Sequence, residues 1–135
     1  MKLYADEDGH EAVRAVDALV VSAIARVAVP AALWRKQRLG QVSVTDSAQL
    51  TSAFQADYRG SGNGEPPRLV AVAVTDGVLE AEADLVAVHP LRAYDAVQLA
   101  SAAAARSAEP ACRTFACFDT ALRTAAARVG FRLLP

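Results

Sequence analysis

The sequence predicts an α/β fold in which helices pack on a mostly parallel sheet. Segments with helical spacing of apolar residues alternate along the chain with short apolar runs rich in valine, the order typical of parallel α/β architectures. The chain has 135 residues, of which 53% are hydrophobic and 21% are charged. This length and composition suit one compact core, so we expect a single domain over residues 1–135.

The first third of the chain contains two predicted helices. Apolar residues at helical spacing predict a helix over residues 11–20 that runs into a short strand around Val20 and Val21. Ser22 is expected to cap a second helix over residues 23–38. Pro30 falls inside this second segment, so we expect a kink or a restart there.

The middle of the chain adds a helix, a loop and a strand. Thr45 is a candidate N-cap for the third helix. Residues 59–67 combine glycine, proline and polar residues, which is the composition of a surface loop. A continuous apolar run over residues 69–74 predicts a strand covered on both faces, and Thr75 can cap the helix that follows.

The last third predicts two more helices and two strands. A helix is expected over residues 91–105, and residues 114–118 are expected to form a strand that ends at Asp119. A final helix over residues 120–129 is then followed by a short strand over residues 131–134.

Charge and hydropathy exclude several classes of protein. The formal net charge of −1 argues against binding nucleic acid through bulk positive charge. No apolar run reaches the roughly 18 residues that a membrane span needs, and residues 1–8 turn acidic where a signal peptide would turn apolar. We therefore expect a cytoplasmic protein without a membrane-spanning segment.

The cysteines and histidines do not indicate a metal site or a disulfide. Cys112 and Cys117 lie on a segment predicted as a strand and should point to opposite faces, so we expect two buried free thiols. His10 and His89 are isolated in the sequence and give no zinc-ligand spacing.

Two aspartates stand where a parallel α/β sheet places its binding site. Asp119 follows a predicted strand, and ligands bind beyond the carboxyl ends of such strands. Asp95 lies in the first turn of the helix over residues 91–105. Both positions also have a purely structural interpretation, because the helix dipole favours an acid there and Asp119 can act as an N-cap. Arg92 is placed to pair with an acid at the mouth of such a site.

The surroundings of these aspartates resemble known motifs. The stretch LRAYDAVQLASA, residues 91–102, resembles the third acidic motif of VapC-type PIN domains, and TFACFDTAL, residues 114–122, is similar to the fourth. KLYADEDGHEAV, residues 2–13, is similar to the first helix of that family. The resemblance extends over nearly the whole chain except residues 59–67.

The resemblance implies a PIN-like three-layer α/β/α sandwich and the toxin of a toxin–antitoxin pair. In that family four carboxylates hold Mg²⁺ or Mn²⁺ and activate water to cut RNA, so the implied activity is that of a metal-dependent endoribonuclease, a hydrolase. Hard divalent ions prefer oxygen ligands and can supply hydroxide near neutral pH. Asp95 and Asp119 match two of the four catalytic and metal-binding acids. The implied partners are a VapB-like antitoxin protein, an RNA substrate and a second copy in a homodimer.

The sequence departs from the family at the other two acids. The strand that carries the first acid would precede the helix matched by residues 2–13, and Ala28 stands where the family has a glutamate. We therefore expect a sandwich without the usual first, central strand, at most four strands in a monomer, and a gap closed by direct pairing of its neighbours or by another subunit. The reading frame is then expected to begin too late, and Mg²⁺ binding and RNA cleavage are expected to be weak.

Other acids are not expected to replace the missing ones. The acidic residues Asp6, Glu7 and Asp8 are interpreted as a solvated turn, and the acids of the helix after Thr75, which are Glu80, Glu82 and Asp84, as an exposed charged face.

Basic and aromatic residues leave further interpretations open. The basic residues Arg35, Lys36 and Arg38 are placed to contact phosphates, but a helix C-terminus also favours cations. Trp34 is expected to pack in a core or a dimer contact.

One alternative function remains, and a second is discounted. A catalytically inactive PIN-fold binding module, or decoy for an antitoxin, has the same sequence features. A phospho-receiver would need an acidic pair after a first strand and a late lysine, but the only lysines are Lys2 and Lys36.

Overall fold

The protein is a mixed α/β structure, as the sequence predicts. The computed structural model describes residues 10–60, 62, 64 and 67–134, and in them six helices and four short strands. The chain divides into two compact units, one formed by Met1–Leu19 with Ile24–Val70 and the other by Val20–Ala23 with Ala71–Pro135. Each helix in the described ranges is too short or too polar to cross a lipid bilayer.

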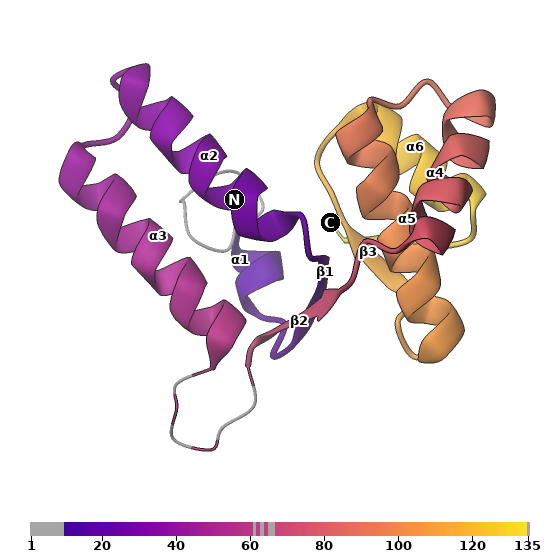
Figure 1. The fold of residues 1–135 in the computed structure, drawn as a ribbon, viewed down its shortest axis with the longest axis horizontal. Helices are drawn as coiled ribbons and strands as arrows, with labels where there is room; N and C mark the ends of the chain where they lie inside the picture. The colour runs from indigo at the N-terminus through magenta and orange to yellow at the C-terminus, as the bar shows by residue number, and fades with distance from the viewer. Residues whose placement is uncertain (1–9, 61, 63, 65–66, 135) are drawn as a thin grey trace. The chain divides into compact units, whose positions relative to one another are not determined.

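In the first unit the helices α2 (Ala25–Arg38) and α3 (Val44–Arg59) lie side by side (Figure 1). Leu33 of α2 and Phe54 of α3 are buried, as expected for apolar residues on the facing sides of packed helices. The Arg26 guanidinium lies 5.6 Å from the centre of the Tyr58 ring, a cation–π distance that joins the start of α2 to the end of α3.

The helix predicted over residues 11–20 is wrong in its extent. Helix α1 (His10–Arg14) ends early, and strand β1 (Leu19–Ser22) follows. The amide N–H of Leu19 donates to the carbonyl oxygen of Arg68 at 3.0 Å. This pairing with a distant segment requires extended backbone and thereby removes the end of the predicted helix.

Two capping predictions in the first half of the sequence are also wrong. Ser22 is the buried last residue of β1 and does not cap α2, whose N-cap position holds Ile24 without a side-chain hydrogen bond. Helix α3 begins one residue before Thr45, and the hydroxyl of Ser43 accepts a hydrogen bond from the amide N–H of Asp46 at 3.0 Å. Pro30 lies within one helix, α2, which has no restart.

In the second unit α5 (Ala93–Ala108) packs against both α4 (Asp76–Val88) and α6 (Thr120–Arg128). Figure 1 shows these three helices together. The predicted cap at Thr75 is confirmed, because its hydroxyl accepts a hydrogen bond from the amide N–H of Val78. The core of this unit is formed by buried residues of α5, α6 and the segments around them, namely Leu99, Cys117, Leu122, Ala125, Ala126 and Phe131.

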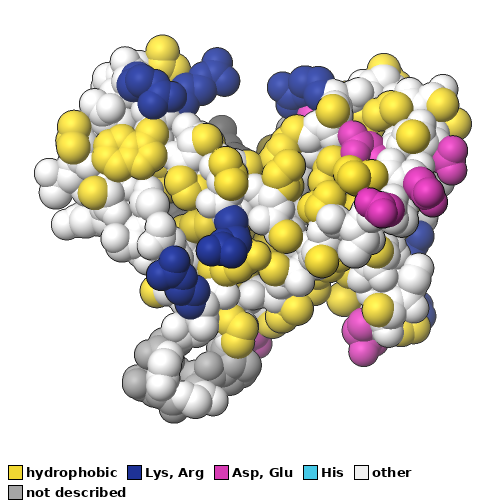
Figure 2. All heavy atoms as spheres, in the orientation of Figure 1, with side chains coloured by type: hydrophobic (Ala, Val, Ile, Leu, Met, Phe, Trp, Pro, Cys, Tyr) yellow, Lys and Arg dark blue, Asp and Glu magenta, His cyan; other side chains and the backbone are white. Residues whose placement is uncertain are grey.

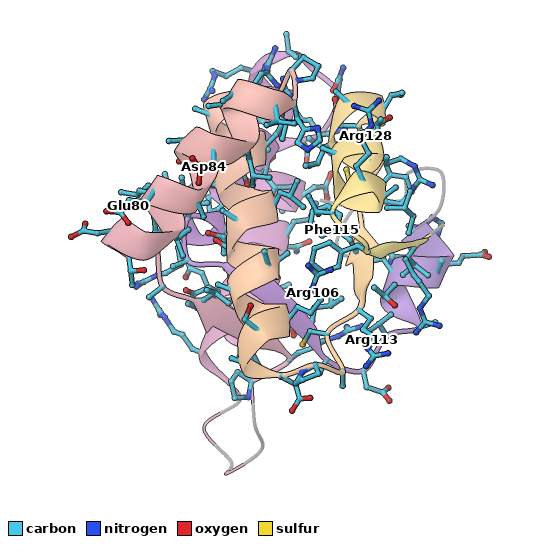
Figure 3. All side chains as sticks on the ribbon, turned by 90° about the vertical axis from the view of Figure 1, so that its right-hand side faces the viewer. Glu80, Asp84, Arg106, Arg113, Phe115 and Arg128 are labelled. Atoms are coloured by element: carbon cyan, nitrogen blue, oxygen red, sulfur yellow. The ribbon has the colours of Figure 1, made fainter. Side chains whose placement is uncertain are left out.

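A cation–aromatic contact connects Arg106 of α5, which is labelled in Figure 3, to the C-terminal end of this core. The Arg106 guanidinium lies 4.2 Å from the centre of the Phe131 ring and donates a hydrogen bond of 3.0 Å to the Val129 carbonyl. The rings of Phe115 and Phe131 lie 5.6 Å apart. Gly130, with φ of 90°, ends the last helix as predicted, since this conformation favours glycine.

The four described strands form two pairs. Strand β3 (Thr114–Ala116) pairs in parallel with β4 (Arg132–Leu134), with Phe115 opposite Leu133. Strand β1 pairs with β2 (Leu69–Val72). Within the described ranges no pairing joins the two sheets, so the expected direct pairing across a gap is not found there.

Several strands are shorter or more exposed than predicted. Strand β2 ends at Val72, and Val70 is 51% exposed, so the expectation of a strand covered on both faces is wrong at this residue. Strand β3 ends at Ala116, before Cys117 and Phe118, which were predicted to belong to it. Cys112 and Cys117 therefore lie outside the strand, and both are free.

Candidate functional site

The first candidate acid, Asp95, lies in the first turn of α5 and is only 7% exposed. Arg92 occupies the N-cap position of the same helix, and its Nε donates a hydrogen bond of 2.7 Å to Asp95 Oδ2. A buried carboxylate needs such a partner because the loss of water around its charge is costly. The short distance is typical of a charge-assisted hydrogen bond.

The second candidate acid, Asp119, is the N-cap of α6 and uses its two carboxylate oxygens differently. Asp119 Oδ1 accepts a hydrogen bond of 3.0 Å from the amide N–H of Leu122. Asp119 Oδ2 lies 3.8 Å from Nη2 of Arg92. The capping interpretation from the sequence is therefore correct for one oxygen, while the other faces a cation from a different helix.

Arg92 brings the two acids together. Its guanidinium contacts Asp95 through Nε and Asp119 through Nη2, so both carboxylates lie within ion-pair distance of one side chain. The hydrogen bond to Asp95 and the charge of Asp95 raise the pKa of Arg92, desolvation by burial lowers it, and the charge of Asp119 makes the smallest contribution, which raises it. The pairing of Arg92 with an acid, which the sequence left open, is present with both.

The charges of the two acids also affect the nearby thiol of Cys117. Its Sγ lies 3.6 Å from the backbone carbonyl oxygen of Asp119, to which the thiol donates. Burial raises the pKa of the Cys117 thiol, and the negative charges of Asp119 and Asp95 raise it further, whereas that hydrogen bond and the charge of Arg123 lower it. A buried thiol with a raised pKa is a poor nucleophile and a poor metal ligand.

Two exposed aromatic residues that were not among the candidates predicted from the sequence lie next to the acids in the chain. Tyr94 directly precedes Asp95 and is 41% exposed, and Phe118 directly precedes Asp119 and is 39% exposed. Gln98 Nε2 donates a hydrogen bond of 2.7 Å to the Tyr94 hydroxyl, and burial of part of the ring raises the pKa of Tyr94. The signal available in the sequence was the aromatic residue directly before each acid.

The carboxylate oxygens of Asp95 and Asp119 suit a divalent ion, but the positive charge of Arg92 beside them does not. Mg²⁺ is commonly held by one or two carboxylates together with water, and Asp95 and Asp119 offer that minimum. However, the guanidinium of Arg92 already contacts both carboxylates. No group of three or more His, Cys, Asp or Glu side chains that could hold a metal ion exists among the described residues. A divalent ion at this pair would therefore have to share the two carboxylates with Arg92.

The other acidic residues discussed from the sequence do not belong to the Asp95–Asp119 pair. Glu80 and Asp84 are exposed on α4 (Figure 3), as expected for a solvated face, and Glu82 of the same helix is partly exposed. Figure 2 shows acidic side chains gathered over this helix. The predicted acidic turn of Asp6, Glu7 and Asp8 lies outside the described residues.

The basic cluster and Ala28 belong to the first unit. Arg35, Lys36 and Arg38 form the last turn of α2, where the helix dipole favours cations. Trp34 of the same helix is half-buried. Ala28, at the position matched to a family glutamate, lies within α2 and brings no carboxylate.

In comparisons with known proteins, no family model matches the chain, and no significant match was found among the curated proteins or the solved structures.

Proposed function

We propose that this chain is a VapC-like PIN-domain protein in which Asp95 and Asp119 are the remaining acids of a Mg²⁺-dependent endoribonuclease site. One observation carries the proposal. The two residues that match acidic motifs come from different elements, the first turn of α5 and the N-cap of α6, and their carboxylates meet at one guanidinium. The PIN-like sandwich, the cytoplasmic location, the VapB-like antitoxin and the homodimer belong to this proposal.

The proposed nuclease activity is weak. Two carboxylates can hold a divalent ion with the help of water, but placing an attacking hydroxide and stabilising the leaving oxygen asks for more ligands. Arg92 also neutralises part of the negative charge that would attract the ion. Both effects act in the same direction, so we expect slow cleavage of RNA.

An RNA cleavage assay of the purified chain with Mg²⁺ or Mn²⁺ tests this proposal. The matched variants are Asp95→Asn and Asp119→Asn, which remove one charge each and keep similar side-chain volumes. We expect weak cleavage in the wild type and none in either variant. Cleavage that persists in both variants would reject the site, whereas robust cleavage that both variants lose would reject the claim of weak activity.

A second candidate is a binding module that no longer cleaves RNA and binds a VapB-like antitoxin. The observation that favours it is the ion pair itself, because Arg92 provides an internal partner for the acids. The DNA upstream of the Met1 codon gives a first discriminator, since an adjacent antitoxin gene provides the partner to co-express. A stable complex with no cleavage under any metal supports the binding module, and cleavage that requires Asp95 rejects it.

A further inference from the structure

Arg92 holds a position in which its charge competes with a metal ion. Its Nε lies 2.7 Å from Asp95 Oδ2 and its Nη2 lies 3.8 Å from Asp119 Oδ2. These two acceptors belong to different helices, so the guanidinium spans the gap between the two carboxylates. A divalent cation that bridged Asp95 and Asp119 would have to approach these same oxygens.

The exposure of the three side chains indicates how this ion pair can open. The Arg92 side chain is 78% exposed, whereas those of Asp95 and Asp119 are 10% and 46% exposed. Asp119 is also held by its hydrogen bond to Leu122, and Asp95 is buried in the first turn of α5. Arg92 is therefore the most exposed member of the group, and we expect its removal to leave the two carboxylates in place.

We propose that Arg92 is an intramolecular counter-ion that excludes divalent cations from the Asp95–Asp119 pair. This inference rests on the proposed function, because it takes that pair as the metal-binding remnant of the site. Arg92 occupies the two carboxylates that an ion would bind, and its positive charge repels the ion. Without Arg92 the two negative charges lose the guanidinium that contacts both of them, which favours the binding of Mg²⁺ or Mn²⁺.

The test compares Mn²⁺ binding by the wild type, Arg92→Gln and Arg92→Lys. Removing a positive charge a few ångströms from a divalent ion should tighten binding about tenfold at moderate salt. Titration calorimetry gives the Kd, and paramagnetic broadening of amide NMR signals locates the ion, with the first turns of α5 and α6 expected to broaden most. Lysine keeps the charge as a compact cation, so Arg92→Lys should bind Mn²⁺ nearly as weakly as the wild type.

Arg128→Gln is the matched control. Arg128 is an exposed arginine on α6 in the same unit (Figure 3), so its replacement changes the net charge equally without removing the partner of the acids. The control should bind Mn²⁺ like the wild type. The double variant Arg92→Gln/Asp95→Asn should lose the gain, and circular dichroism checks that each variant remains folded.

The outcomes separate this inference from the proposed function. Tighter Mn²⁺ binding by Arg92→Gln without RNA cleavage supports the role of Arg92 and rejects the nuclease. Equal Mn²⁺ affinity in the wild type, Arg92→Gln and Arg128→Gln overturns the inference, and so does an equal gain in Arg92→Lys and Arg92→Gln. If Arg92→Gln gives no specific gain in Mn²⁺ affinity, but the wild type cleaves RNA and Asp95→Asn does not, the proposed function stands without the inference.

Discussion

Asp119 has two roles that substitution can separate, a helix cap and a charge in the acidic pair. Its Oδ1 accepts a hydrogen bond of 3.0 Å from the amide N–H of Leu122, and its Oδ2 faces Arg92 at 3.8 Å. In Asp119→Ala both are lost. Replacing an aspartate N-cap by alanine typically costs about 1 kcal/mol of stability, while the ion pair at 3.8 Å is partly exposed and adds little. We therefore expect a loss of about 1 kcal/mol, or about 4 °C in Tm for a chain of this size.

Asp119→Asn isolates the cap, because asparagine caps helices about as well as aspartate but carries no charge. It should retain most of the stability that Asp119→Ala loses, yet abolish any RNA cleavage and Mn²⁺ binding at the pair. Ser43→Ala is the matched control, since Ser43 caps α3 with a hydrogen bond of the same 3.0 Å length in the first unit. It should lose similar stability and leave Mn²⁺ binding unchanged.

Urea unfolding followed by far-UV circular dichroism measures these differences. Trp34 lies in the first unit, so its fluorescence alone would not report on α6. If Asp119→Asn is as unstable as Asp119→Ala, the cap is not what Asp119 contributes to stability. If Asp119→Ala is as stable as the wild type, the capping hydrogen bond has no net effect and the reasoning fails.

Three further predictions concern the core of the second unit. Leu99→Ala, at a fully buried position, should lower the free energy of unfolding by about 2–5 kcal/mol, whereas Leu79→Ala, at a position 45% exposed, should lower it far less. Chemical denaturation compares the two variants, and equal losses of stability would contradict the assigned core. Alkylation of the native protein at pH 8 should modify Cys112 faster than Cys117, because burial raises the pKa of the Cys117 thiol. Mass spectrometry of the adducts shows which cysteine reacts first, and faster modification of Cys117 would be inconsistent with its burial. Because the pKa of Cys117 is higher in the folded than in the unfolded protein, the stability of the fold should fall as the pH rises past the unfolded pKa. Ser101→Ala should be neutral or stabilising by about 1 kcal/mol, because the Ser101 hydroxyl is buried and has no hydrogen-bond partner among the described residues; a clear loss of Tm would mean that the hydroxyl is satisfied.

The sequence by itself determined the features that depend on neighbouring residues. The cap at Thr75, the acid in the first turn of α5 and the acid that follows β3 and caps α6 are all where the sequence places them. Each depends on residues within about one helical turn, and local spacing specifies such contacts. The alternation of helices and short apolar strands also follows from local pattern, which is why the α/β class was predictable.

Only the tertiary structure decided the features that join distant segments. The sequence predicted a strand around Val20 and Val21, but only the structure showed that it begins at Leu19, which pairs with Arg68, and that the helix before it ends at Arg14, because backbone hydrogen bonds to a second strand outweigh a modest helix propensity. The contact of Arg92 with both Asp95 and Asp119 likewise joins the starts of two helices. Spacing alone placed Arg92 near Asp95, but only the packing of α5 against α6 brings Asp119 within reach of the same guanidinium.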